Sequence, residues 1–235
     1  EVKSLAVTNG VVIASTMADA LLVVDFSNHS QPVLLSSIIK ADGDLRIQDH
    51  WVFSTTREGL EVYDLADLSM PRRVQMVNIG QASAVRDLQV VGDLVYLASS
   101  AGLRIAKISP TNRVVQLGSY STEGSASAVA VSGNIALLSG GLDGLNLLDV
   151  TVAGQPRLIA KVSSVAGDTQ IRDSLAFVLS GSSFDVLNIG DPTSPKRVGN
   201  VILAGRSAWG RPGSLALDSD GHHAVVVLEQ GGLAE

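Results

Sequence analysis

Short apolar runs separated by Gly, Asn, Asp and Pro recur along the whole chain and predict β-strands joined by tight turns. The clearest example predicts four strands at residues 129–131, 135–139, 145–150 and 157–162. Gly133-Asn134 and Asp143-Gly144 tolerate the positive φ of tight turns, and Pro156 precedes the last strand, where no ladder donor is required. We therefore predict a four-stranded antiparallel sheet in this region.

This pattern is repeated along the chain. In each repeat the third apolar run ends at an anchor residue, and in four of the five repeats a proline follows seven residues later, as in LLVVDFSNHSQP. The anchor pairs are Asp25 with Pro32, Asp64 with Pro71, Asp149 with Pro156, and Asn188 with Pro195, while Lys107 and Val114 hold the same places in a degenerate repeat. Successive anchors are 39, 43, 42 and 39 residues apart, which is long enough for one four-stranded unit.

The second and third predicted strands of each repeat are apolar almost throughout, whereas the first alternates, with Leu5 and Val7 on one face. A sheet that is apolar on both faces must be covered on both faces. Four-stranded antiparallel sheets that pack face to face around an axis are the blades of a β-propeller. We predict an all-β fold: a single β-propeller domain over residues 1–235 with five complete repeats and a partial sixth. The predicted blades span residues 1–41, 42–82, 83–125, 126–166, 167–205 and, in part, 206–235.

The segments LLVVDFSNHSQP, LEVYDLADLSMP, LNLLDVTVAGQP and FDVLNIGDPTSP resemble the LVIVD repeat, in which an apolar run, an Asp, a loop and a Pro follow one another. The turns at Gly92-Asp93 and Gly133-Asn134 resemble the second hairpin of that repeat. The resemblance covers residues 1–203 and implies a propeller in an exported or surface-exposed bacterial or archaeal protein, often as one module of a larger chain. The third repeat departs from the pattern at Lys107 and Val114.

The C-terminal region predicts half of a sixth blade. Residues 214–217 and 224–228 predict its first hairpin, and Gly231-Gly232-Leu233 predicts the turn into a third strand. An incomplete propeller exposes strand edges and an apolar blade face. We therefore expect the chain to be a segment of a longer polypeptide or assembly, in which flanking sequence or a neighbouring subunit completes the ring. Residues 1–235 alone are expected to associate or to close poorly.

Composition narrows the classes of partner. With 46% hydrophobic residues, the 235-residue chain can bury a sizeable core. Charged residues make up 17%, the net charge is −6, and the scattered basic residues form no stripe, so we expect no nucleic-acid binding. No apolar run is long enough for a membrane-spanning helix, and we expect no membrane insertion. Cysteine is absent, which excludes disulfides, thiolate metal sites and cysteine nucleophiles.

Three carboxylates align at the start of the first predicted strand of their repeats: Asp44, Asp87 and Asp168. These positions approach the central channel of a propeller, and an all-oxygen site there favours calcium or magnesium over zinc. Alternatively, each Asp accepts hydrogen bonds from backbone amides at a strand end, and Arg46, Arg86 and Arg172 are close enough in sequence to neutralise the carboxylates. We favour the second interpretation and predict no metal, cofactor or catalytic residue, with calcium in the channel as the alternative.

The other polar motifs favour structural roles. The recurrence of the anchor residues predicts that each carboxylate caps the loop leading to Pro. The segment 218–221, DSDG, contains oxygen ligands as a calcium loop does, but a strand follows it, so we predict a hairpin turn. His222 and His223 are adjacent and would point to opposite faces of a strand, so they could not share an ion. Trp209 is the candidate for stacking on a glycan.

Two function classes remain. The first is a non-catalytic propeller module for protein–protein, surface or structural interaction in a larger, exported protein, with flanking domains or neighbouring subunits as partners. The second is a propeller hydrolase, lyase or metal-binding protein with a site at the channel carboxylates. We favour the first class because no G-x-S-x-G motif and no phosphate loop followed by a helix is present. An extracellular or cell-surface location is expected from the resemblance.

Overall fold

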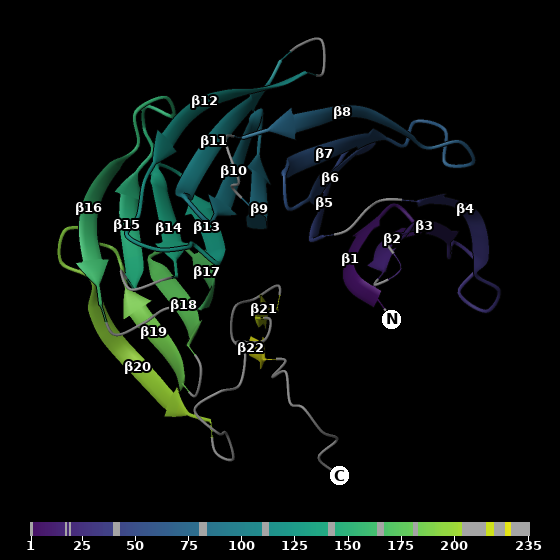
Figure 1. Ribbon diagram of the computed structural model, residues 1–235. Coiled ribbons are helices and arrows are strands. Elements are labelled where there is room, and N and C mark those ends of the chain that lie inside the picture. The colour runs from purple at the N-terminus through teal and green to yellow at the C-terminus, as the bar shows by residue number, and fades with distance from the viewer. Residues whose placement is uncertain are drawn as a thin grey trace. The chain divides into compact units, whose positions relative to one another are not determined.

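The computed structural model describes residues 2–16, 18, 20–39, 43–79, 84–109, 113–140, 144–163, 167–180, 183–203, 215–218 and 224–226. They form five four-stranded antiparallel sheets and one strand pair (Figure 1), which confirms the predicted fold class of five complete units and a partial sixth. The chain divides into two compact units, residues 1–100 with 104–117 and residues 101–103 with 118–235, and each is described by itself.

Consecutive strands pair in order within every sheet. The first sheet consists of β1 (Val2–Thr8), β2 (Val11–Thr16), β3 (Ala20–Asp25) and β4 (Val33–Ile39). The second consists of β5 (Leu45–Gln48), β6 (Trp51–Thr55), β7 (Gly59–Asp64) and β8 (Arg72–Asn78). The third consists of β9 (Val85–Val91), β10 (Leu94–Ser99), β11 (Gly102–Ile108) and β12 (Val114–Tyr120).

The remaining sheets follow the same plan. The fourth consists of β13 (Ala128–Ser132), β14 (Ile135–Ser139), β15 (Leu145–Asp149) and β16 (Arg157–Val162). The fifth consists of β17 (Asp168–Arg172), β18 (Leu175–Ser180), β19 (Ser183–Asn188) and β20 (Lys196–Ile202). The sixth is the pair β21 (Leu215–Leu217) and β22 (Ala224–Val226). The turn glycines Gly92 and Gly133 have φ of 59° and 54°, which explains glycine at these tight hairpins.

Apolar side chains on both faces of the second sheet are buried. Val52 and Tyr63 pack in a cluster with residues of the first sheet, including Ile13. Phe53 and Leu60 face the other way, into a cluster with residues of the third sheet. The fifth sheet repeats this arrangement in the second unit, where one cluster joins it to the fourth sheet and another joins it to Leu215 of the sixth. Sheet-on-sheet burial on both faces is therefore the source of the core.

A β-bulge recurs at one place between the third and fourth strands of four sheets. It follows Val23, Val62, Leu147 and Val186. As a result, the residue before the anchor lies opposite Leu34, Arg73, Leu158 and Arg197 in the respective sheets. A bulge redirects the side chains that follow it, and here it selects which fourth-strand residue reaches the third strand.

Outer strands are also joined to the next sheet. The Gln75 side chain in β8 donates a 2.9 Å hydrogen bond to the Val114 carbonyl and accepts a 2.8 Å bond from the Val114 amide. Ser36 in β4 donates its hydroxyl to the Leu68 carbonyl at 2.8 Å. These side chains satisfy backbone groups that face away from their own sheet and fix its spacing from its neighbour.

The glycine before β17 is a sensitive point of the fold. Gly167 donates its amide to the Ser139 hydroxyl at 2.6 Å, and a Cβ at this position would overlap the Leu179 carbonyl. We predict that Gly167→Ala costs about 3 kcal/mol or more, because backbone must shift, and lowers Tm by roughly 6 °C or more. Gly199→Ala is the control, since a Cβ there meets only Val186 side-chain atoms at 3.5 Å or beyond. Equal melting temperatures for the two variants would contradict the predicted clash.

Candidate functional site

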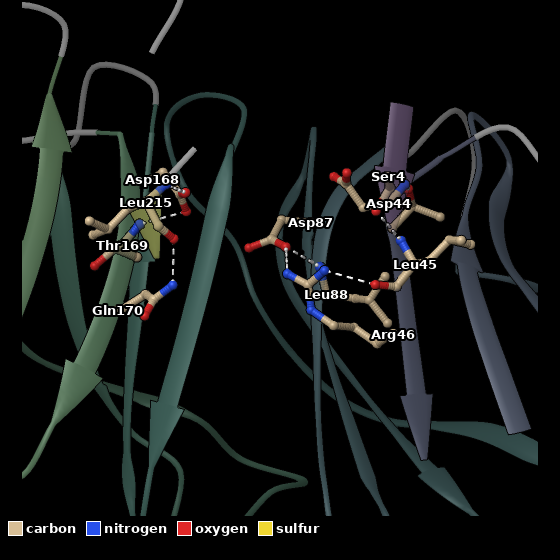
Figure 2. Close-up of polar contacts among 11 residues, drawn as sticks. Ser4, Asp44, Leu45, Arg46, Asp87, Leu88, Asp168, Thr169, Gln170 and Leu215 are labelled. Atoms are coloured by element: carbon tan, nitrogen blue, oxygen red, sulfur yellow. Dashed lines mark hydrogen bonds and ion pairs between the residues drawn. The ribbon is translucent and has the colours of Figure 1, made fainter. Parts of the chain in front are cut away.

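Asp168 lies at the start of β17 and joins the fifth sheet to the sixth (Figure 2). One carboxylate oxygen accepts the Thr169 amide at 2.9 Å, and the other accepts the Leu215 amide of β21 at 2.6 Å. The Gln170 side chain donates to the Leu215 carbonyl at 2.5 Å. Two side chains of β17 thus hydrogen-bond to both backbone groups of one residue in the first strand of the next sheet.

Ser4 makes the corresponding contact in the first sheet. Its hydroxyl accepts the Leu45 amide of β5 at 3.0 Å (Figure 2). Ser4 and Asp168 hold the same register position, one residue before Leu5 and Thr169 in their first strands. In these two sheets this position therefore binds the first strand of the following sheet, with a hydroxyl in one and a carboxylate in the other.

Asp87 is paired with a cation from the preceding sheet. The Arg46 guanidinium lies 3.0 Å from its carboxylate, and the Leu88 amide donates to the same oxygen at 2.8 Å. Asp44 lies just before β5, where its amide donates to the Thr55 hydroxyl at 2.9 Å. Of the three arginines considered from sequence, Arg46 neutralises a candidate carboxylate, and Arg172 instead donates to the Asp218 carbonyl at 2.8 Å.

The geometry of these carboxylates bears on metal binding. Within the described ranges, no group of three or more His, Cys, Asp or Glu side chains is placed to hold a metal ion. Asp87 and Asp168 direct oxygens at N–H donors, and a cation would have to displace those donors. What the arrangement can do chemically is bind one sheet to the next.

The anchor residues occupy the predicted places. Asp25, Asp64, Asp149 and Asn188 are each the last residue of the third strand of their sheets. In each case the side-chain oxygen accepts the amide two residues later, at 2.8 to 2.9 Å. This hydrogen bond closes an Asx turn at the start of the loop that leads to the fourth strand.

Hydrogen bonding lowers the pKa of the anchor carboxylates. The Ser27 amide is the main cause at Asp25, and the Ala66 amide, followed by Arg72, is the main cause at Asp64. At Asp149 the Thr151 side chain contributes most. The anchors are thus ionised acceptors at neutral pH, and Asn188 serves the same turn without a charge.

The third strands contain a set of polar residues that the sequence interpretation missed. Three positions before each anchor, the five sheets carry Leu22, Glu61, Arg104, Asn146 and Asp185. Four of these five positions are thus polar within third strands that are otherwise mostly apolar. Glu61 and Asp185 are 4% and 1% exposed, so they need partners in the interior.

Glu61 forms a buried network in the second sheet. The Tyr63 hydroxyl donates to it at 2.6 Å, and the Arg73 guanidinium donates to its other oxygen at 2.5 Å. Burial, and then the hydrogen bond to Glu61, raise the pKa of Tyr63 well above its ordinary value. The hydrogen bond to Glu61 is also the main cause of the raised pKa of Arg73. Arg73 reaches the carboxylate because of the β-bulge after Val62.

Asp185 forms the equivalent network in the fifth sheet. Arg197, which the bulge places in the same register as Arg73, lies 3.0 Å from its carboxylate. The Asn200 amide and the Ser183 hydroxyl each donate to it at 2.8 Å. The second and fifth sheets thus each contain an acid–arginine pair. The sequence carries a signal for this pair: an acid three residues before the anchor, with Arg two residues after the anchor proline.

Several sequence candidates lie outside the described residues. These are Trp209, Ser219, Asp220, Gly221, His222, His223 and Gly231-Gly232-Leu233, and the glycan, ion-loop and turn predictions made on them stay predictions.

One known family model matches two parts of the chain. The family model of the LVIVD repeat matches residues 13–39 and 82–122, so it includes the third repeat despite Lys107 and Val114. A search of curated proteins finds no match to the chain. In the part of the chain that the structure describes, no helix is long and apolar enough to cross a membrane.

Solved structures share the fold at low sequence identity. A protein from Lactobacillus plantarum is 12% identical with a TM-score of 0.81, over 95% of this chain and 76% of that one. The RRP9 WD40 repeats are 15% identical with a TM-score of 0.74, over 97% of this chain and 72% of that one. A chain of the Mitotic Checkpoint Complex is 14% identical with a TM-score of 0.76, over 96% of this chain and 71% of that one. The chain spans 65–78% of the length of the solved chains it resembles. WD40 repeats form β-propellers, and the predicted propeller is confirmed.

We predict that millimolar calcium or magnesium leaves the melting temperature unchanged. A ligand bound only by the native state raises its stability by mass action, and here the carboxylate oxygens already accept N–H donors. Differential scanning fluorimetry with and without chelator measures the effect. An upward shift that Asp87→Ala or Asp168→Ala abolishes would establish the channel site instead.

Tyr63 should stay protonated in the folded protein at pH about 11, where an exposed tyrosine is mostly ionised. Its raised pKa means that its stabilising contribution is present below the ordinary value and is lost as pH rises beyond it. Phenolate absorbance should therefore be equal in wild type and Tyr63→Phe while both are folded. When urea unfolds both proteins at the same pH, wild type should show the absorbance of one more phenolate than Tyr63→Phe. A difference between the folded proteins at this pH would show that Tyr63 ionises normally.

Proposed function

We propose that this chain, a β-propeller that carries LVIVD repeats, is a non-catalytic module that binds other proteins. The polar side chains that the sequence offered as reactive groups support this proposal by their contacts. Asp87 and Asp168 bind backbone amides and an arginine, and the anchors close turns. These groups stabilise the fold, so a partner would be bound by other side chains on the surface.

One observation carries the proposal, namely the face of the first sheet that points away from the second. We call it the open face and define it by Leu5, Val7, Leu22, Val24 and Leu34. Strand pairing places these side chains on one side of the sheet, opposite Ala6 and Ile13, which pack on the second sheet. Leu5 and Val7 are 59% exposed and Leu34 is 58% exposed. Contiguous exposed apolar side chains of this kind mark interaction surfaces.

Fourth strands add further apolar surface. The exposed residues are Val74 and Met76 in β8, Val115 and Leu117 in β12, and Val198, Val201 and Ile202 in β20. As the outermost strands of their sheets, they also present edge backbone groups that can pair with another strand. The protein assembly named for one similar structure, the Mitotic Checkpoint Complex, accords with binding through a propeller surface.

We propose further that the module acts within a larger, exported protein or assembly, in which flanking strands or a neighbouring subunit complete the ring. Its support is the resemblance to LVIVD repeats. Fractionation of the native host, with an antibody against residues 1–235, tests the location. Recovery in the cytosol would contradict export.

Site-specific photo-crosslinking in the native host tests protein binding. A photoreactive residue at Leu34, on the open face, should give adducts whose added mass is polypeptide, because an apolar surface is desolvated by a partner. The control probe at Glu58, an exposed turn residue between β6 and β7, should give none. Absence of a protein adduct at Leu34 and also at Val198 would contradict the proposed function.

A further inference from the structure

The loop between β3 and β4 contains the triplet Asn28-His29-Ser30, and no other Asn-x-Ser or Asn-x-Thr triplet occurs in the chain. When the middle residue is not proline, this triplet is an acceptor sequence for N-linked glycosylation, in which a sugar is attached to the asparagine Nδ2. Such a triplet also arises by chance, so its structural setting decides whether it can act as an acceptor. The acceptor has to be exposed, and the fold must not need its amide nitrogen.

The loop meets the first requirement. Every residue from 27 to 34 is exposed, and Asn28 and Ser30 belong to this run. The middle side chain packs on the loop itself, because the His29 ring lies edge-on to the Phe26 ring with 5.8 Å between their centroids. The asparagine and the serine of the triplet are therefore both accessible from solvent.

The side chain of Asn28 closes a hydrogen-bonded turn within the triplet. Its Oδ1 accepts the Ser30 amide at 3.2 Å and the Ser30 hydroxyl at 2.9 Å. Both bonds use Oδ1, and Nδ2 has no partner among the residues that the structure describes. The turn thus holds the hydroxyl and the amide of the triplet together and leaves the amide nitrogen available to react.

The equivalent loops of other sheets show that this turn does not need the nitrogen. Asp67 and Asp191 also lie three residues after an anchor, and each accepts the amide and the hydroxyl two residues later at 2.6 to 3.0 Å. Val152 holds this position in the fourth sheet, where the Gln155 amide still donates to the Val152 carbonyl at 2.7 Å. Asparagine in place of aspartate therefore changes the group offered to solvent and not the shape of the loop.

We propose that Asn28 is a site of N-linked glycosylation. This inference rests on the export included in the proposed function, because the modification belongs to surface loops of secreted proteins. The donor is an oligosaccharide joined through pyrophosphate to a lipid carrier. A bond forms between Asn28 Nδ2 and the anomeric carbon of the sugar. The bond from that carbon to the pyrophosphate oxygen breaks, its electron pair leaves with the pyrophosphate, and one Nδ2 proton passes to a base of the transferase.

Mass spectrometry of the protein recovered from the extracytoplasmic fraction of the native host tests the site. Trypsin releases residues 4–40 as one peptide, since Lys3 and Lys40 are the nearest basic residues on either side of the loop. The wild-type peptide should gain the mass of an oligosaccharide, and fragmentation should place that mass on Asn28. Asn9 is exposed in the same peptide but is followed by Gly-Val, so it should stay unmodified.

Three variants separate the acceptor from the turn. Asn28→Asp keeps the acceptor oxygen of the turn, as Asp67 does in its own loop, and should lose the added mass completely. Ser30→Ala should also lose it, because the triplet requires a hydroxyl. Ser30→Thr is the matched control. Thr193 makes the same contact in the fifth sheet, so this variant should keep the added mass.

The outcomes distinguish this site from the proposed function. An unmodified Asn28 in exported wild-type protein would overturn the site while leaving export and protein binding in place. A sugar mass that persists in Asn28→Asp would place the sugar on another residue and would overturn the site as well. Recovery of the protein in the cytosol alone would overturn export and, with it, the glycosylation.

Discussion

Burial of both faces of each four-stranded sheet is the constraint on which the rest of this structure depends. The second sheet shows it most fully, with Tyr63 buried against the first sheet and Phe53 against the third. Because third strands such as GLEVYD are buried along their whole length, a sheet without a neighbour would leave its central strand in water. The stacking of successive sheets therefore follows from the hydrophobic effect acting on one repeated pattern.

Apolar packing alone does not set the position of one sheet against the next. Polar side chains set this position. Ser4 and Asp168 bind the first strand of the following sheet, and Gln75 binds the backbone of an outer strand. Hydrogen bonds are directional, so each one fixes the position of the neighbour to within a fraction of a residue. The carboxylates that suggested ion binding from sequence belong to this set of contacts.

The polar position in the third strand distinguishes the sheets from one another. Glu61 and Asp185 hold buried pairs with Arg73 and Arg197, which a β-bulge brings into reach. Burying such a pair costs desolvation energy that offsets most of the attraction between the two charges. The first sheet carries leucine at both of these positions, Leu22 and Leu34, and so lacks such a pair.

The sequence by itself determined the repeat, the strand order and the turns, because the period-two pattern and the Asp–Pro spacing are local signals that no tertiary contact has to supply. It also placed Asp25 and the other anchors, whose hydrogen bonds reach only two residues along the chain. Only the tertiary structure decided what Asp87 and Asp168 bind, since their partners are 41 and 47 residues away. It likewise decided the pairing of Glu61 with Arg73, which requires a bulge that adds one residue to the count between them. Contacts that cross from one strand or sheet to another depend on register, and register is a property of the packed molecule.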